Sequence, residues 1–497
     1  MKFLLCTYHF FLYLYGGIKK GFFEMKRNII GRENEKIALQ EVYNSNVSEY
    51  VAVYGRRGVG KTFLIQEFFD NKMVFEVTGL SNGNTAEQLA NFNRSLNKNN
   101  TGEPFSVSNN WMEAFEQLIT FVRRTSQKRK VIFFDEIHWL DTLHSGFVQA
   151  LEHFSNGWAC RRKNIVLIMC GSTNSRMINM LINSEVGLCN RLVKKMYLQQ
   201  FTLRECELYF QSRKMNLGRY EIAECYMVMG GIPLYLNQLE KKLSVAQNFD
   251  RMFFAENATL KNELKNMYAQ LFNNDADYLR LMEALSNQMG GFSRNEIVTV
   301  TKISSGGALT EILQNLENCC LIRSYPPFDK RKRNTFYQLI DPFTLFFYKF
   351  INNIDYRDDD FWSKGVEMSI RNLWVGHAFE ILALLHVNEI KEALNITGIE
   401  SRISLWQSEH TLPEEQVNLV INRNDGIVNL IEIKYSNMKY VITKAYEEKL
   451  KNKIVDFKAQ TKTKKTVQFL MLTTYGIIKN KYSEVVHKEL MMSNLFK

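Results

Sequence analysis

The chain has 497 residues, of which 45% are hydrophobic and 23% are charged, and this composition is ordinary for a globular protein. Its length suggests about three domains. The eight cysteines include no CxxC pair, which argues against a zinc site or a disulfide framework and for a reducing cytosol, so a cytoplasmic protein is expected. The net charge of +11 fits an anionic partner such as nucleic acid, and a solvated basic surface is the alternative.

The N-terminus carries an apolar, aromatic run at residues 3–15 that superficially resembles a signal peptide. The run is too short to span a bilayer, and no clear cleavage site follows it. Because Met25 directly precedes the first recognisable motif, we expect residues 1–24 to be a mis-called extension. A membrane anchor is the alternative. No other stretch is long and apolar enough to cross a membrane, so no membrane partner is expected.

Residues 29–160 read as alternating strands and helices. A short apolar run at 50–54 is followed by glycines and by an amphipathic stretch at 62–71, which predicts strand, loop and helix. Further apolar runs lie at 130–134 and 164–170. Such runs are typical of a parallel sheet buried on both faces, so an α/β fold is predicted.

The loop after the first predicted strand has the pattern of a phosphate-binding loop, or Walker A motif. Its glycines let backbone amides point inward at phosphates, and the following helix N-terminus adds positive potential. Lys61 would reach the β- and γ-phosphates, and the Thr62 hydroxyl would ligate magnesium. The predicted cofactors are therefore ATP and Mg²⁺, bound by Gly55, Arg56, Arg57, Gly58, Val59, Gly60, Lys61, Thr62 and Phe63.

Acidic and polar residues follow the next two predicted strands. Asp135 would hold magnesium through water, and Glu136 would orient the attacking water as a general base; two acids capping a helix are the alternative. Ser172 and Thr173 are candidate sensors of the γ-phosphate, with a simple turn as the alternative. Arg191 is a candidate phosphate contact, in its own chain or from a neighbour, and a surface role is its alternative.

The middle of the chain is expected to be helical over 200–260, with an interruption at 230–233. Residues 268–350 predict a winged helix, since Ser293 and Glu296 form a capping-box pattern between two helical stretches. Its expected elements are helices at 277–288, from 293, and at 307–318, and strands at 320–325 and 335–339 that flank a basic wing at 329–333.

The last 150 residues predict another α/β unit. Its expected elements are a helix at 375–387, strands at 416–421 and 427–435, a lysine-rich helix at 442–460 and a strand at 466–473. The predicted domains are the extension 1–24, a P-loop ATPase domain 25–200, a helical lid 201–265, the winged helix 266–350 and a C-terminal domain 351–497.

With these residues in place, residues 26–260 resemble the AAA-type ATPases often called the archaeal ATPase family, which are related to STAND and origin-recognition ATPases. The resemblance implies that Gly31 and Arg32 lie near the nucleotide base and that Pro233 lies in the helical lid. It rests on the P-loop and on residues 30–35, 134–136, 170–172, 201–203 and 230–235.

Residues 337–343, 374–380 and 431–434 resemble the branch of this family whose C-terminal domain is similar to PD-(D/E)xK nucleases. Such nucleases need an acid on one strand and Glu-x-Lys on the next, where the acids bind magnesium. Glu432 and Lys434 share one strand face. A three-residue hairpin loop at 424–426 would place residue 418 opposite Glu432.

Residue 418 is an asparagine, which offers a cation only a neutral carbonyl. Glu380, on the preceding predicted helix, is a further candidate ligand. We therefore expect a degraded nuclease-like domain with Glu380, Asn418, Glu432 and Lys434 at its former site. An active metal-dependent nuclease is the alternative.

Three functions remain open from the sequence. The first is a magnesium-dependent ATPase that repositions its C-terminal domains, in association with DNA. The second is a slow nucleotide switch of the STAND type that acts as a protein-interaction scaffold, and the third is the active nuclease. Oligomer or protein contacts compete with DNA contacts, whose candidates are the wing and Lys449, Lys451, Lys453, Lys458, Lys462, Lys464 and Lys465.

Overall fold

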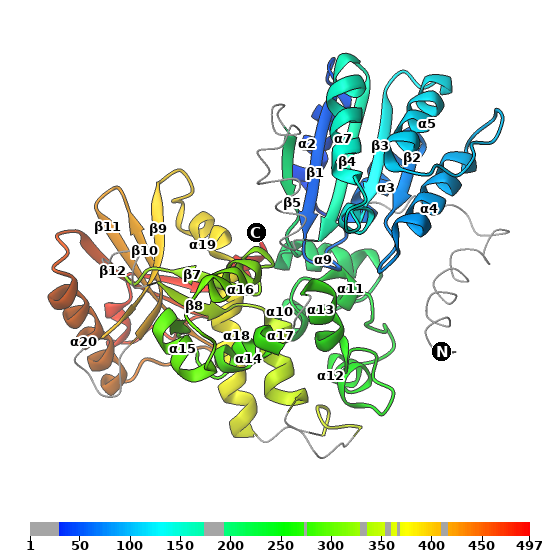
Figure 1. The fold of residues 1–497 in the computed structure, drawn as a ribbon. Coiled ribbons are helices and arrows are strands. Elements are labelled where there is room, and N and C mark those ends of the chain that lie inside the picture. The colour runs from blue at the N-terminus through cyan, green and yellow to red at the C-terminus, as the bar shows by residue number, and fades with distance from the viewer. Residues whose placement is uncertain are drawn as a thin grey trace.

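The computed structural model describes residues 29–172, 193–272, 276–328, 335–352, 359–364, 368–408 and 416–497. The expected extension 1–24, Thr173, Arg191 and the expected basic wing lie outside these residues. Figure 1 shows two sheets far apart, with the helices of the middle of the chain between them. No helix in the described ranges is long and apolar enough to cross a membrane.

The first sheet has five parallel strands in the order β2-β3-β4-β1-β5. This confirms the predicted parallel sheet, although the two edge strands were not predicted. The edge strand β5 contains two consecutive lysines and therefore lacks the apolar run that marks the central strands. The strands are β1 (Glu49–Gly55), β2 (Met73–Thr78), β3 (Lys130–Asp135), β4 (Ile165–Ser172) and β5 (Val193–Tyr197).

Helices cover both faces of this sheet, because alternate residues of each strand point to opposite sides (Figure 1). Val51 and Val53 belong to the core that includes α2 and α3, whereas Tyr50 and Ala52 belong to the core of α4, α5 and α7. The helices are α2 (Glu33–Asn44), α3 (Lys61–Phe69), α4 (Thr85–Lys98), α5 (Trp111–Arg124), α6 (Ile137–Leu140) and α7 (Phe147–Glu152).

The middle of the chain begins with a group of helices, as expected. They are α9 (Leu203–Ser212), α10 (Arg219–Met229), α11 (Pro233–Leu236), α12 (Val245–Phe249) and α13 (Glu263–Leu271). The expected domain boundary after residue 265 falls inside α13. The lid and the following segment are therefore joined by a continuous helix.

The next segment contains helices and a small antiparallel sheet of order β6-β8-β7. The predicted capping box of Ser293 and Glu296 is present. The assignment of this segment as a winged helix stays a prediction. Its elements are α14 (Ala276–Ser286), β6 (Phe292–Ser293), α15 (Arg294–Thr301), α16 (Gly307–Asn318), β7 (Ile322–Tyr325), β8 (Phe336–Leu339) and α17 (Pro342–Phe346).

The C-terminal sheet is mixed, with the order β13-β12-β11-β10-β9. Helix α18 lies against one face and α20 against the other. The elements are α18 (Met368–Leu385), α19 (Val387–Leu394), β9 (Ser401–Gln407), β10 (Gln416–Arg423), β11 (Ile427–Lys434), α20 (Lys444–Thr461), β12 (Thr466–Thr473) and β13 (Lys488–Met491).

One hydrophobic core runs through all of these parts. It joins the α2–α3 face of the first sheet to the helices of the middle segment, to α18 and to one face of the C-terminal sheet. The first sheet, the middle segment and the C-terminal unit therefore pack directly against one another.

We expect Phe134→Ala to destabilise the first sheet by about 3–5 kcal/mol, because it deletes a fully buried ring. Phe134 is 0% exposed, and its ring lies 5.9 Å from the rings of Phe75 and Phe115, centroid to centroid. Urea unfolding followed by tryptophan fluorescence tests this, since Trp111 lies in the same core. Met112→Ala is the control at a 45% exposed position of α5, and it should change stability by less than about 0.5 kcal/mol. Equal effects of the two substitutions would contradict the expectation.

Candidate functional site

The loop between β1 and α3 depends on glycine at several positions. Gly58 and Gly60 have φ of 82° and 92°, which favours glycine. A Cβ on Gly55 would lie 2.3 Å from the carbonyl oxygen of Leu198, so no side chain fits there. The backbone therefore takes the curled path that the P-loop pattern predicted.

Lys61 and Thr62 open α3 at the carboxyl end of the sheet. The Lys61 Nζ donates to the carbonyl oxygens of Gly55 and Arg56, at 2.9 and 3.1 Å. The Thr62 Oγ1 lies 2.9 and 3.1 Å from the two carboxylate oxygens of Asp135, the last residue of β3. The hydroxyl and the carboxylate predicted to serve magnesium thus meet at one point.

Burial, together with the neighbouring Glu136, raises the pKa of Asp135 to about 6, against the opposing effect of hydrogen bonds from Thr62 and Cys170. Asp135 is 3% exposed. The positive charge of Lys61 also lowers the pKa of Asp135, but burial and Glu136 raise it by more. The arrangement suits a group that would bind a divalent cation.

Glu136 and Ser172 both lie at the same edge of the sheet. Glu136 follows β3 directly, with a left-handed φ of 45°, and its Oε2 lies 3.5 Å from Nδ1 of His138. Ser172 ends β4 and pairs in register with Gly55 of the P-loop. The predicted sensor is therefore next to the loop, while Thr173 and Arg191 lie outside the described residues.

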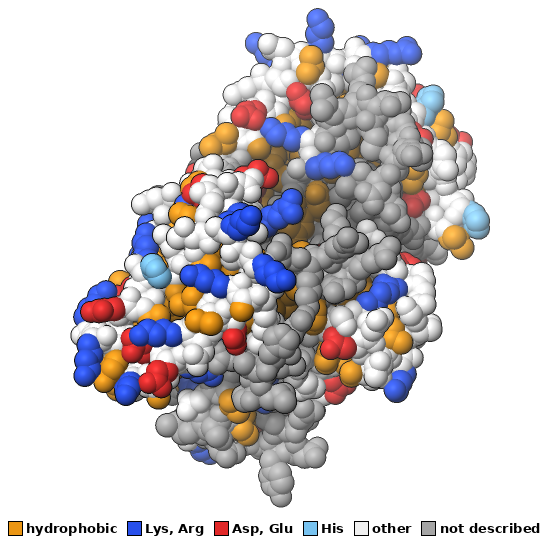
Figure 2. Space-filling model, turned by 90° about the vertical axis from the view of Figure 1, so that its left-hand side faces the viewer, with side chains coloured by type: hydrophobic (Ala, Val, Ile, Leu, Met, Phe, Trp, Pro, Cys, Tyr) orange, Lys and Arg blue, Asp and Glu red, His pale blue; other side chains and the backbone are white. Residues whose placement is uncertain are grey.

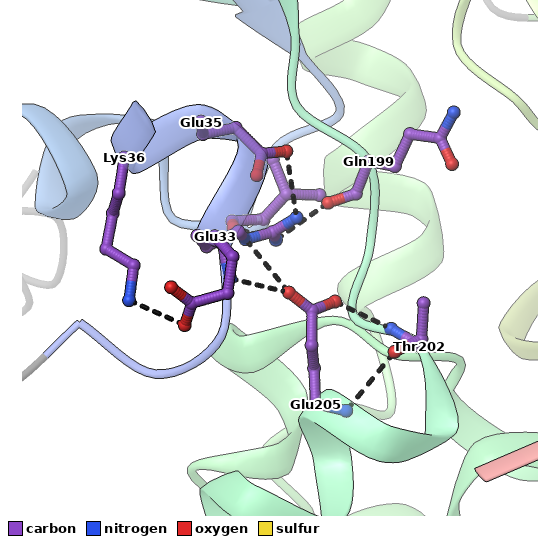
Figure 3. Close-up of polar contacts among 8 residues, drawn as sticks. Glu33, Glu35, Lys36, Gln199, Thr202 and Glu205 are labelled. Carbon is purple, nitrogen blue, oxygen red and sulfur yellow. Dashed lines mark hydrogen bonds and ion pairs between the residues drawn. The ribbon is translucent and has the colours of Figure 1, made fainter. Parts of the chain in front are cut away.

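Arg32 connects the start of α2 to the P-loop. Its Nη2 donates to the carbonyl oxygens of Val59, at 3.2 Å, and Gln199, at 2.7 Å. Its backbone amide donates to the Glu205 carboxylate at 2.9 Å. Figure 3 shows Glu205 reaching from α9 towards the start of α2, with Thr202 beside it. The Arg32 side chain is therefore bound to the protein backbone, and its predicted place near the nucleotide base stays a prediction.

The Gly-Gly-Ile-Pro segment also touches the P-loop. Pro233 is the first residue of α11, and the Leu234 amide donates to the Gly58 carbonyl oxygen at 3.2 Å. A Cβ on Gly58 would lie 2.9 Å from the Leu234 side chain and 3.0 Å from that of Ile232. The expected lid thus contacts the loop through the residues on either side of Pro233.

Arg56 has a partner that the sequence reasoning missed. Its guanidinium forms a two-pronged ion pair with the carboxylate of Asp341, with 3.2 Å between Nη2 and Oδ2 and a second contact from Nη1 to Oδ1. Burial lowers the pKa of Arg56, but Asp341 raises it by more, so the arginine stays charged. The Arg56 side chain is thus occupied by Asp341, while the predicted place of Arg56 in the loop that binds the nucleotide stays a prediction. Asp341 directly precedes Pro342 and caps α17, a pattern that predicts a helix start but no partner for Arg56.

A second cluster forms in the C-terminal unit. Leu419 pairs with Ile431, which is the register that the predicted three-residue loop requires, and Gly426 in that loop has a φ of 84°. Asn418 donates its amide to the Glu380 carboxylate from α18. The four residues Glu380, Asn418, Glu432 and Lys434 are therefore brought together.

Glu432 is bound by three protein donors. Its carboxylate lies 3.0 Å from Lys453 Nζ, 3.2 Å from Lys434 Nζ and 3.0 Å from the Tyr446 hydroxyl. Lys453 is 5% exposed, so its predicted contact with DNA phosphates is wrong. The sequence reasoning missed Tyr446 and Lys453, although their spacing of seven places them on one face of α20.

The carboxylates of this cluster are satisfied without a metal ion. Burial raises the pKa of Glu380 to about 7, although Lys434 opposes the shift, and Glu432 adds to it. Across the described residues, no group of three or more His, Cys, Asp or Glu side chains is placed to hold a metal ion.

We expect Asp135→Asn to stabilise the nucleotide-free protein in a pH-dependent way. Because the pKa of Asp135 rises from 3.8 to about 6, ionisation destabilises the fold progressively as the pH increases through this window. The variant removes this cost, at most about 3 kcal/mol, while keeping an acceptor for Thr62. Urea unfolding from pH 4.5 to 8 should show a stability difference that grows up to about pH 6 and then levels off. A difference independent of pH would contradict the expectation.

Comparisons with known proteins agree with the geometry of the first site. Residues 30–239 match a family of ATPase domains found predominantly in Archaea. Over 45 residues, 9% of this chain, the chain is 40% identical to the uncharacterized ATP-binding protein MJ0423 of Methanocaldococcus jannaschii, of which it covers 76%. It is 22% identical over 415 residues to the uncharacterized protein MJECL04 of the same organism, covering 82% of this chain and 88% of that one.

Solved structures with a similar course of the chain include the Walker-type ATPase PABY2304 of Pyrococcus abyssi and the ORC2 protein of Aeropyrum pernix. The first is 18% identical, with a TM-score of 0.47, and covers 65% of this chain and 96% of that one. The second is 15% identical, with a TM-score of 0.44, and covers 65% and 95%. Residues 30–239 of this chain belong to the family of ATPase domains found predominantly in Archaea.

Proposed function

We propose that the chain hydrolyses ATP with magnesium at the carboxyl edge of the first sheet. The observation that carries the proposal is the contact of the Thr62 hydroxyl with the Asp135 carboxylate, at 2.9 and 3.1 Å, beside Lys61. These groups come from different elements, α3 and β3, and the fold brings them to one place. Their order and chemistry are those that phosphoryl transfer requires.

The residues of this edge fit a magnesium ion. Magnesium prefers oxygen ligands and keeps several waters, so one hydroxyl and one carboxylate suffice beside the nucleotide phosphates. When bound, it would neutralise charge between the β- and γ-phosphates. A bound cation would also favour the ionised form of Asp135, whose pKa is raised without one.

The chain's own residues would perform the remaining tasks. Lys61 would exchange its contacts with the Gly55 and Arg56 carbonyls for phosphate oxygens. Glu136 would accept the proton of the attacking water, since it directly follows Asp135 at the open edge. Ser172, beside Gly55, would contact the γ-phosphate or the water.

Two substitutions separate binding from turnover. We expect Lys61→Ala to lose both ATP affinity and hydrolysis, and Glu136→Gln to bind ATP while its turnover falls about 10²–10⁴-fold. Calorimetry with a non-hydrolysable analogue and a steady-state phosphate-release assay measure the two effects. Glu116→Gln, at an exposed position of α5, is the matched control and should behave like the wild type.

The wild type decides between an ATPase and a slow switch. Steady turnover that Glu136→Gln abolishes supports the ATPase. Tight ATP binding with negligible turnover would instead indicate the switch of the STAND type. Unchanged ATP binding in Lys61→Ala would contradict the proposal that ATP binds at the P-loop.

DNA association forms a second part of the proposal. On the face shown in Figure 2, Lys and Arg side chains lie among fewer acidic ones, which suits a polyanion. Exposed lysines continue along α20 and the loop after it: Lys444, Lys449, Lys451, Lys458, Lys462 and Lys464. Stimulation of the ATPase by DNA, weakening as salt increases, is the expected result.

We also propose that the C-terminal unit is a nuclease-like fold whose metal site is lost. The support is the cluster itself: Asn418 donates a hydrogen bond to Glu380 where a metal-binding acid would repel it. Glu432 is paired with Lys453 and Lys434. These contacts satisfy both carboxylates from within the protein.

Restoring the acid should restore part of the metal site. We expect Asn418→Asp to gain affinity for Mn²⁺, because a third carboxylate then faces Glu380 and Glu432. Calorimetry with Mn²⁺ and a plasmid-cleavage assay measure the change. Asn429→Asp, a buried change on β11 outside the cluster, is the matched control and should gain no affinity. Cleavage by the wild-type protein would overturn the proposal and favour the active nuclease.

A further inference from the structure

The Arg56–Asp341 ion pair joins the P-loop to a segment almost 300 residues away, and both side chains are buried. Arg56 is 5% exposed and the Asp341 side chain 0%. A buried charge that loses its partner is strongly disfavoured, so the two residues move together or the pair breaks at high cost. Two parallel contacts also fix the orientation of the guanidinium, which a single contact would not.

Asp341 is held firmly on its own side. Its Oδ2 accepts from the backbone amide and the hydroxyl of Thr344, at 3.0 and 2.6 Å, and so caps α17. The backbone amides of Ile340 and Asp341 both donate to the carbonyl oxygen of Leu321, which directly precedes β7. Asp341 is therefore tied to the small sheet and to α17 at once.

Arg56 touches the nucleotide machinery on the other side. Its carbonyl oxygen accepts from Lys61 Nζ at 3.1 Å, and this is a contact that Lys61 gives up when it turns to phosphates. Arg56, whose side chain is anchored by Asp341, thus competes with the phosphates for Lys61 through its backbone carbonyl. A shift of Asp341 would alter the position of the Arg56 carbonyl. Conversely, ATP binding would alter the position of Arg56 relative to Asp341.

The connection continues from α17 into the C-terminal unit. The ring of Phe343 lies 4.9 Å from that of Tyr235, in α11, and the ring of Phe346 lies 5.6 Å from that of Trp374. Trp374 belongs to α18, the helix that carries Glu380. Packed side chains therefore lead from the P-loop through α17 to the second cluster.

We propose that Asp341 is a positioning residue of the ATP site and that, through Arg56, the nucleotide state of the P-loop is linked to the placement of α17 and the C-terminal unit. The inference rests on the proposed binding of ATP at the P-loop. Linkage is reciprocal, so a partner that shifts the C-terminal unit changes ATP affinity by the same factor as ATP changes the affinity for that partner.

The test uses the full chain and two kinds of variant. Asp341→Asn removes the charge but keeps the shape, and Arg56→Met with Asp341→Leu replaces the pair by apolar side chains of similar size, a change that folded proteins tolerate. Glu224→Gln is the matched control, because it breaks another ion pair between distant segments, that of Glu224 in α10 with Arg371 in α18. Neither residue of this pair belongs to the P-loop. Calorimetry gives the affinity for a non-hydrolysable ATP analogue, and hydrogen exchange of residues 336–350 is compared with and without the analogue.

We expect both Asp341 variants to bind the analogue about five- to 150-fold more weakly, the usual range of coupling between sites. Bound analogue should slow exchange at 336–350 in the wild type and in Glu224→Gln, but not in the double variant. Thermal melting shows whether the double variant is folded, and Arg56→Lys, which keeps the charge without the two-pronged contact, should lie between wild type and Asp341→Asn.

Wild-type affinity together with a wild-type exchange response in the folded double variant would overturn the inference and leave the proposed function intact. Failure of the proposed function looks different, since the wild type itself would then bind no analogue or Lys61→Ala would bind it normally. Equal losses in Glu224→Gln and Asp341→Asn would show general loosening of the interface and would also overturn the inference.

Discussion

The P-loop is held in place by contacts with residues from other parts of the chain. A loop rich in glycine has few side chains with which to fix its own shape, and its amides must be ready for phosphates before the nucleotide arrives. Arg32 binds the Val59 carbonyl, Arg56 is anchored by Asp341, and the Leu234 amide binds the Gly58 carbonyl. Each support comes from a different part of the chain, so the loop is formed only when those parts have packed together.

These supports also make the ATPase domain depend on the rest of the chain. Glu205, which holds the Arg32 amide, lies in the first turn of α9. The amide of Leu203, in the same turn, donates to Nε2 of the buried His386 at 3.0 Å. Burial lowers the pKa of His386 to about 4, so the ring stays neutral and can accept this bond. A second route thus leads from the C-terminal unit to the P-loop, separate from that of Asp341.

The two clusters of acids in the molecule show opposite electrostatics. Asp135 has only hydroxyl and thiol donors at its carboxylate and a raised pKa, as fits a group that would receive a cation. At Glu432, burial raises the pKa but Lys453 and Lys434 lower it by more, so the net shift is downward. The first carboxylate is thus hydrogen-bonded to neutral donors, whereas the second is paired with two lysines.

The amino-acid sequence was sufficient to predict the local backbone features of the P-loop and of the hairpin that carries Asn418. Glycine spacing and the helix start predicted the P-loop, apolar runs predicted the central strands, and the loop of Asn424, Asp425 and Gly426 predicted the register of β10 against β11. These follow from short-range rules of backbone conformation and alternation, which neighbouring residues suffice to apply. The edge strand β5 was missed because its lysines conceal the apolar pattern.

The pairing of charged side chains depends on how distant parts of the chain pack together. No residue near Arg56 in the sequence predicts its ion pair with Asp341. Lys453 is one of many lysines in a basic helix, and only the packing of α20 on the sheet places it beside Glu432. Charge pairing depends on which residues are buried together, and burial is a property of the packed molecule. The sequence therefore identified the ATP-binding segment, while the fold determined how that segment is joined to the rest of the chain.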